Sequence, residues 1–134
     1  MFDDFYGTHR RYLDQGKAEG RDVVLDIDVK GARQLRQRIP EAISVFILAP
    51  SREELVKRLC ARGDVSEQVI QKRVAEAVRE IQNFGQYDYV LVNDSVEAAS
   101  DQLWSIVKAA RIQRKNPDVG ARVEQILGTF SEKI

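Results

Sequence analysis

Apolar residues gather in three short runs along the first two thirds of the chain. The runs are rich in β-branched side chains and do not alternate cleanly with polar residues, which is typical of strands covered on both faces. They read "VVLDI" at 23–27, "SVFILA" at 44–49 and "YVLVN" at 89–93. Helical patterns lie between and after them, so the chain is predicted to be an α/β protein with three parallel core strands flanked by helices.

Amphipathic patterns of helical period fill most of the remaining chain, and several have recognisable ends. Ser51, with Glu54 three residues later, forms a capping box, and Ser66 can cap the helix that follows. Pro117 closes the turn before the last helix. The predicted helices cover residues 9–19, 31–38, 51–62, 66–84, 96–115 and 119–132.

Length and composition narrow the classes of protein to which the chain can belong. Its 134 residues fit one domain, and 43% hydrophobic with 31% charged residues is typical of a globular protein. The 21 basic and 21 acidic residues balance, so nucleic-acid binding is not expected. No apolar run approaches the roughly 18 residues of a membrane span. The single cysteine, Cys60, excludes an internal disulfide and favours a cytoplasmic setting.

Two carboxylates close the first apolar run. Asp26 and Asp28 stand at the carboxyl end of a predicted strand, where ligands bind in parallel sheets, and their spacing puts both on one side of the strand. They would repel each other unless a hydrated Mg²⁺ or a hydrogen-bond donor joined them. The alternative is structural: Asp28 caps nearby backbone amides and Gly31 permits a tight turn. The residues alone leave both interpretations open.

Three arginines on two consecutive predicted helices could close over phosphate groups. Arg58 and Arg62 lie one helical turn apart, where like charges repel unless an anion lies between them. Arg73 follows on the next helix, after a short turn. The alternative is a solvated face in which Glu54 pairs with Arg58 and Glu76 pairs with Arg73.

Near the start of the chain, "YGTHRR" at 6–11 combines an aromatic hydroxyl, a glycine and a helix-starting threonine. A helix start of this kind can receive a phosphate or a polar base, so Tyr6 and Thr8 are candidate ligand contacts. An ordinary N-cap at Thr8 is the simpler alternative.

A phosphate-binding loop is the one expected feature that these residues do not show. ATP-binding α/β sheets that transfer phosphate usually carry G-x-x-x-x-G-K-[ST], whose amides and lysine hold the phosphates. The only Gly-Lys pair is Gly16 and Lys17. It has Arg11 in place of the first glycine, Ala18 in place of the hydroxyl residue, and a helical pattern before it. It is therefore not such a loop.

With these features in place, the chain resembles guanylate kinases from Tyr6 nearly to its end. Five ordered blocks carry the resemblance without large insertions, and together they are far more specific than "LDID-x-x-G" alone. The blocks are "YGT" at 6–8, "LDIDVKGARQLR" at 25–36, "FILAPSREELVKRLCARG" at 46–63, "VIQKRVAEAVREI" at 69–81 and "YDYVLVND" at 87–94.

The resemblance implies transfer of the terminal phosphate of ATP to GMP with Mg²⁺, a role in purine metabolism. It implies that Tyr6 and Thr8 contact GMP, with the threonine hydroxyl near guanine. It also makes Asp26 and Asp28 the acidic strand end beside the GMP and Mg²⁺ sites, without making either a direct metal ligand.

The same resemblance implies roles for residues on the ATP side. Arg58 and Arg62 match lid arginines that reach the ATP phosphates, and Arg73 matches one that bridges the donor and acceptor phosphates, so all three are expected to be catalytic. Asn93 and Asp94 fall where the family meets adenine.

Relative to that family, these residues make an incomplete P-loop-kinase-type sheet that lacks the P-loop strand. We expect one truncated guanylate-kinase-like domain over residues 1–134, with a lid at about 51–84. The gap between the first two predicted strands would be closed by direct pairing, by a partner chain or self-association, or by residues preceding a truncated start. The isolated chain is expected to be inactive. A non-catalytic guanylate-kinase-like module that binds partner proteins is the alternative function.

Overall fold

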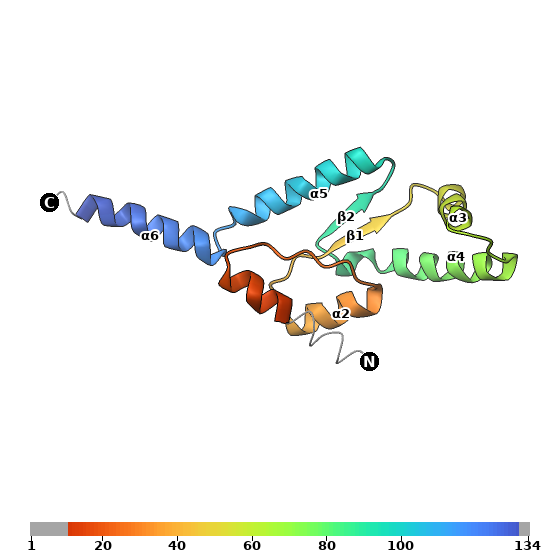
Figure 1. Ribbon diagram of the computed structural model, residues 1–134, viewed down its shortest axis with the longest axis horizontal. Coiled ribbons are helices and arrows are strands. Elements are labelled where there is room, and N and C mark those ends of the chain that lie inside the picture. The colour runs from red at the N-terminus through yellow and green to blue at the C-terminus, as the bar shows by residue number, and fades with distance from the viewer. Residues whose placement is uncertain (1–10, 132–134) are drawn as a thin grey trace. The chain divides into compact units, whose positions relative to one another are not determined.

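The computed structural model of the chain describes residues 11–131. Residues 11–18 are helical, and the remaining elements follow in the order drawn in Figure 1. Within the described residues, the predicted helices are confirmed with small differences at their ends, and so are the second and third predicted strands; residues 9, 10 and 132 of the predicted helices lie outside that range. The elements are α2 (Val29–Arg38), β1 (Val45–Leu48), α3 (Arg52–Ala61), α4 (Glu67–Gln82), the short 3-10 helix η1 (Phe84–Gln86), β2 (Tyr89–Val92), α5 (Val96–Arg111) and α6 (Pro117–Ser131).

The sheet of the described residues has two strands, β1 and β2, and they run parallel. The amide of Tyr89 donates to the carbonyl of Ser44 at 3.1 Å, and the amide of Asn93 donates to the carbonyl of Leu48 at 2.8 Å. Both bonds join residues that are the same distance apart in sequence, which is the register of a parallel pair. The predicted α/β class, a parallel sheet flanked by helices, is therefore confirmed.

The first predicted strand is the exception, because residues 21–28 belong to no helix or strand. Their side chains do alternate as in extended chain: Val23, Leu25 and Ile27 are partly covered, whereas Val24 is 71% exposed. An apolar β-branched run favours extended backbone, but a strand also needs a neighbour that accepts and donates ladder hydrogen bonds. No such neighbour lies beside this segment among the described residues, so the prediction of three core strands was wrong by one.

The chain divides into two compact units. Unit 1 comprises Met1–Phe46 and Gln71–Val90, and unit 2 comprises Ile47–Ile70 and Leu91–Ile134. Among the described residues, the buried large apolar side chains are Ile39 and Phe46 in unit 1 and Leu91 in unit 2. The core of each unit is therefore small, and many apolar side chains keep contact with solvent.

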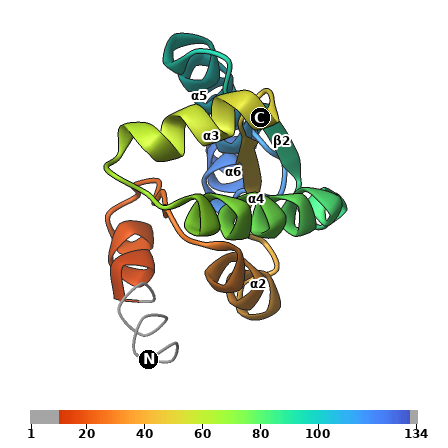
Figure 2. The same ribbon diagram turned by 90° about the vertical axis from the view of Figure 1, so that its right-hand side faces the viewer.

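Within unit 1, α2 lies beside the segment that follows α4, as Figures 1 and 2 both show. The guanidinium of Arg36 lies 4.7 Å from the ring centroid of Tyr87, and the ring of Phe46 meets Tyr87 edge-on at 5.0 Å. Directly before β2, Asp88 Oδ2 accepts from the amide of Ser44 at 2.8 Å and from its hydroxyl at 3.2 Å. These contacts hold the start of β1 against the start of β2.

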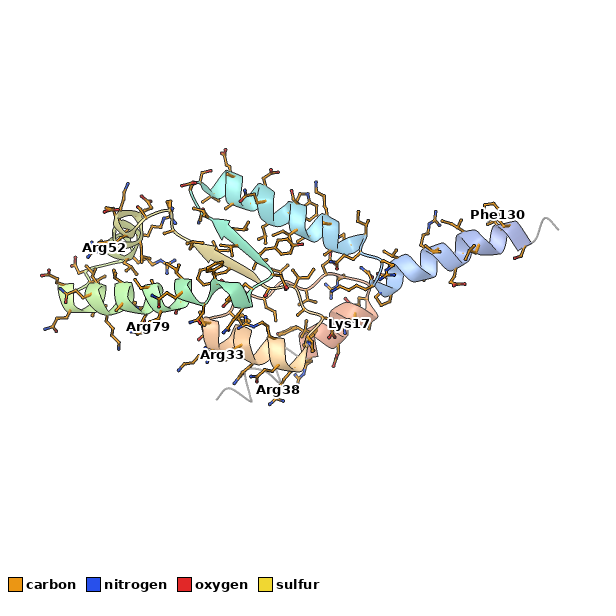
Figure 3. All side chains as sticks on the ribbon, turned by 180° about the vertical axis from the view of Figure 1, so that it is seen from behind. Lys17, Arg33, Arg38, Arg52, Arg79 and Phe130 are labelled. Carbon is orange, nitrogen blue, oxygen red and sulfur yellow. The ribbon has the colours of Figure 1, made fainter. Side chains whose placement is uncertain are left out.

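Within unit 2, serine caps set the helix starts. Ser51 Oγ accepts from the amide of Glu54 at 3.1 Å, which confirms the predicted cap of α3. Ser95 caps α5 in the same way, accepting from the amide of Ala98 at 3.2 Å. On α6, Phe130 is 67% exposed near the end of the helix (Figure 3). Within residues 11–131, no helix is long and apolar enough to cross a membrane.

Candidate functional site

The predicted site residues fall in both units of the chain. Tyr6 and Thr8 lie outside the described residues. The others divide by unit, with Asp26, Asp28 and Arg73 in unit 1 and Arg58, Arg62, Asn93 and Asp94 in unit 2.

In unit 1, Asp26 and Asp28 both lie on the exposed side of the extended segment that precedes α2. Asp28 is the N-cap of α2, and its Oδ1 accepts from the amide of Gly31 at 2.8 Å. The capping interpretation of Asp28 is therefore confirmed. Its carboxylate accepts from one of the amide groups that have no hydrogen-bond partner within the helix at every helix start. Asp26 has no hydrogen-bond or ion-pair partner among residues 11–131. Its carboxylate is left to solvent.

Gly31 has a different role from the predicted turn. It lies buried in the first turn of α2, and its φ is not positive, so no unusual backbone conformation requires glycine there. A Cβ at this position would come within 3.2 Å of Asp28 Oδ1 and 3.3 Å of Ile27 Cβ. Glycine is therefore favoured because the cap and the preceding chain approach the helix closely, not because the chain reverses.

In unit 2, Arg58 connects α3 to the end of β2. Its Nε donates to Glu54 Oε1 at 3.3 Å, one turn earlier on the same helix, which confirms the predicted pair. Its Nη2 also donates to the backbone carbonyl of Asn93 at 2.7 Å. The short second bond is charge-assisted and comes from a side chain that is only 36% exposed. Two residues expected on the ATP side are thus in direct contact.

Asn93 follows β2 and presents an unused acceptor. Its amide and carbonyl are engaged with Leu48 and Arg58, while its side-chain Oδ1 is buried and has no hydrogen-bond partner. An unpaired buried carbonyl oxygen destabilises a folded protein by about 1–3 kcal/mol, so such an atom usually has a ligand or water to bind. Asp94 is exposed next to it, with its backbone amide bonded to the carbonyl of Val92 at 3.1 Å.

The other two predicted arginines keep their guanidinium groups in solvent. Arg62 is the C-cap of α3 and is exposed, with its backbone amide donating to carbonyls of the last helical turn. Arg73 is exposed on α4 and forms no ion pair with Glu76, although both residues lie in the described part of the chain. The pairing that would have explained Arg73 as a solvated structural residue is therefore absent.

No group of three or more His, Cys, Asp or Glu side chains that could hold a metal occurs within residues 11–131. Mg²⁺ in nucleotide sites is usually bound by one or two carboxylates together with water and substrate phosphates, so a full protein cage is not required. Asp26 and Asp28, on one exposed side of the chain, fit that arrangement.

The sequence did not indicate the contact between Arg36 and Gln86. Arg36 Nη2 donates to Gln86 Oε1 at 3.1 Å, and these residues are 50 positions apart. The helical pattern of α2 indicates only that Arg36 lies on a polar face. No local motif could have indicated what it meets.

The chain is similar to known guanylate kinases over most of its length. The family model described as guanylate kinase matches residues 1–110. The chain is 48% identical over 113 residues to a guanylate kinase of Escherichia coli (strain K12), covering 84% of this chain and 55% of that protein. It is 45% identical over 130 residues to one of Koribacter versatilis, covering 95% of this chain and 56% of that protein. The chain thus spans about half the length of these relatives.

Proposed function

The chain belongs to the guanylate kinase family, and from that premise we propose that it carries nucleotide-contacting residues of an enzyme that transfers phosphate from ATP to GMP. In this reaction an oxygen of the GMP phosphate attacks the γ-phosphorus of ATP, and the bond from that phosphorus to the β–γ bridging oxygen breaks. ADP leaves with the electron pair. Because the protein forms no covalent bond to the transferred phosphate in this reaction, positioning of the substrates and stabilisation of charge supply most of the catalysis.

The main support for an ATP site is the contact between Arg58 and Asn93. The buried, unpaired Oδ1 of Asn93 is an acceptor, and the exocyclic amine of adenine is a donor that would satisfy it. Asp94, exposed beside it, is a second acceptor at the same strand end. Binding in this position agrees with the general placement of ligands beyond the carboxyl ends of parallel strands.

Arg58 and Arg62 are the proposed phosphate-binding residues of the lid, which we place at about 51–84. Arg58 is held by Glu54 and by the carbonyl of Asn93, so a phosphate oxygen would replace Glu54 as its anionic partner. Arg62, exposed at the end of α3, would neutralise charge that develops on the transferring phosphoryl group. Arg73, unpaired with Glu76, is proposed to contact both donor and acceptor phosphates.

On the GMP side, we propose that Asp26 and Asp28 act beside the bound nucleotide, together with Tyr6 and Thr8. The cap of α2 uses Oδ1 of Asp28, so its other oxygen and the free carboxylate of Asp26 would hold water molecules of a hydrated Mg²⁺. The ion, when bound with ATP, would neutralise charge on the phosphates.

We further propose that these 134 residues form a single guanylate-kinase-like domain that is inactive by itself. They contain no G-x-x-x-x-G-K-[ST] loop, so the amides and lysine that hold ATP phosphates in this class of fold are not among them. Loss of that charge stabilisation lowers the rate of phosphoryl transfer by several orders of magnitude. The same chain is expected to regain activity when a segment with that loop is supplied.

The test is a ¹H–¹⁵N NMR titration of the chain with ATP and, separately, with GMP. We expect saturable ATP-dependent shifts of the Asn93 side-chain amide and about ten-fold weaker ATP binding in Asn93→Ala. The matched control is Asn83→Ala, because among the described residues the side chain of Asn83 bonds only to the carbonyl of Arg79, one turn earlier. Equal ATP binding by Asn93→Ala and wild type would refute the adenine assignment. Binding of neither nucleotide would contradict the proposal and favour the alternative, a non-catalytic module.

A further inference from the structure

A polar pocket in unit 1 is lined by none of the residues assigned to nucleotide binding above. It has a volume of about 330 Å³ and is lined by Arg33, Arg36, Gln37 and Gln86. The first three belong to α2 and the last to η1. Pockets that bind small molecules have volumes of about 300–1,000 Å³, so a small polar ligand fits.

Arg36, one of the lining residues, is held in place by two contacts. Its guanidinium stacks over the ring of Tyr87, with 4.7 Å to the centroid, and its Nη2 donates to Gln86 Oε1 at 3.1 Å. These contacts fix the plane of the guanidinium and reduce the entropy lost when it binds a ligand. The other terminal nitrogen, Nη1, is buried and has no hydrogen-bond partner among the described residues. A buried charged donor left in this state is strongly unfavourable until an acceptor reaches it.

The pocket offers donors and no negative charge. Neither Asp nor Glu lines it. Because Gln86 Oε1 accepts from Arg36, the NH₂ group of Gln86 remains as a further donor. Arg33 (Figure 3) is exposed and has no ion-pair partner within residues 11–131. Two arginines and two glutamines thus line the pocket without a carboxylate among them.

We propose that this pocket, the α2–η1 pocket, binds the phosphate group of a small phosphorylated ligand. A phosphate monoester carries nearly two negative charges and three terminal oxygens, which matches two arginines and the adjoining amide donors. A carboxylate carries one charge and two oxygens and would leave one arginine unbalanced. None of the four lining residues is among the proposed ATP or GMP contacts.

The experiment measures binding of inorganic phosphate and pyrophosphate to the full chain by ¹H–¹⁵N NMR. The reporters are the side-chain amides of Gln37 and Gln86 and the Nε–H groups of Arg33 and Arg36. We expect saturable shifts at these groups, and affinities at least about ten-fold weaker in Arg33→Gln and Arg36→Gln. The control is Arg38→Gln, which removes the same charge from the last turn of the same helix but does not line the pocket.

Each outcome decides for or against the site. Arg36→Gln also removes the contacts with Tyr87 and Gln86, so its folding is checked by circular dichroism, and Arg33→Gln tests the proposal without that complication. Shifts that chloride reproduces at equal ionic strength would overturn the proposal, as would phosphate affinity that is unchanged in Arg33→Gln. Equal weakening by Arg38→Gln would reduce the effect to net charge on α2 and would also overturn it.

Discussion

Replacing Arg58 with alanine tests whether α3 is held to the end of β2 by this side chain. The substitution removes two interactions: the ion pair with Glu54 on the same helix and the bond to the backbone carbonyl of Asn93. The first is local to α3, whereas the second joins elements that are 35 residues apart in sequence. The two interactions can therefore be separated by substituting either end of the ion pair.

The expected loss of stability follows from the burial of these groups. An ion pair one helical turn apart on a partly exposed face contributes about 0.3–0.5 kcal/mol. A hydrogen bond from a charged donor contributes about 1.5–3 kcal/mol, and the lower part of that range applies because the Arg58 side chain is 36% exposed. Arg58→Ala should therefore lower the free energy of unfolding by about 2 kcal/mol.

Urea denaturation measures this difference. The sole tryptophan, Trp104, lies on α5 in unit 2, the unit that contains Arg58, so its fluorescence reports the relevant transition alongside circular dichroism. With a slope of about 1.5 kcal/mol/M, the midpoint of Arg58→Ala should fall by about 1.3 M.

Glu54→Ala is the matched control, because it removes the ion pair and keeps the bond to Asn93. It should cost only about 0.5 kcal/mol. Should Arg58→Ala prove no more destabilising than Glu54→Ala, the bond to the Asn93 carbonyl contributes nothing and the proposed link between α3 and β2 is refuted.

Two further pairs of substitutions test local features of the fold by the same denaturation assay. Gly16→Ala should lower the free energy of unfolding by about 1–2 kcal/mol, since a Cβ there would overlap Val23 Cγ2. Gly128→Ala has open space around its Cβ and should raise the free energy of unfolding by up to about 1 kcal/mol through helix propensity. Equal effects of the two substitutions would refute the close packing at residue 16. Asp28→Ala should cost about 1 kcal/mol through loss of the N-cap of α2, while Asp26→Ala should change stability by less than about 0.5 kcal/mol. Equal costs would count against the cap.

The sequence predicted the features that depend on neighbours a few residues away. The serine caps at Ser51 and Ser66, the pair of Arg58 with Glu54 and the cap at Asp28 all join residues three or four positions apart. Helical period and capping chemistry carry that information directly.

Features that depend on distant chain could not be obtained in this way. Residues 23–27 have the composition of a strand, but a strand forms only where a neighbouring strand exchanges backbone hydrogen bonds with it. The sheet of the described residues consists of β1 and β2 and does not include residues 23–27. The contacts of Arg58 with Asn93 and of Arg36 with Gln86 span 35 and 50 residues. In each case the sequence indicates a polar helix face and only tertiary structure shows what that face meets.

The central claim is that this chain carries nucleotide-contacting residues of a guanylate kinase without the loop that holds ATP phosphates. The most direct measurement is ADP and GDP formation by the purified 134-residue chain with ATP, GMP and Mg²⁺. We expect no turnover above the rate without protein, together with saturable nucleotide binding in the NMR titration. Turnover that scales with chain concentration and persists through further purification would contradict the account.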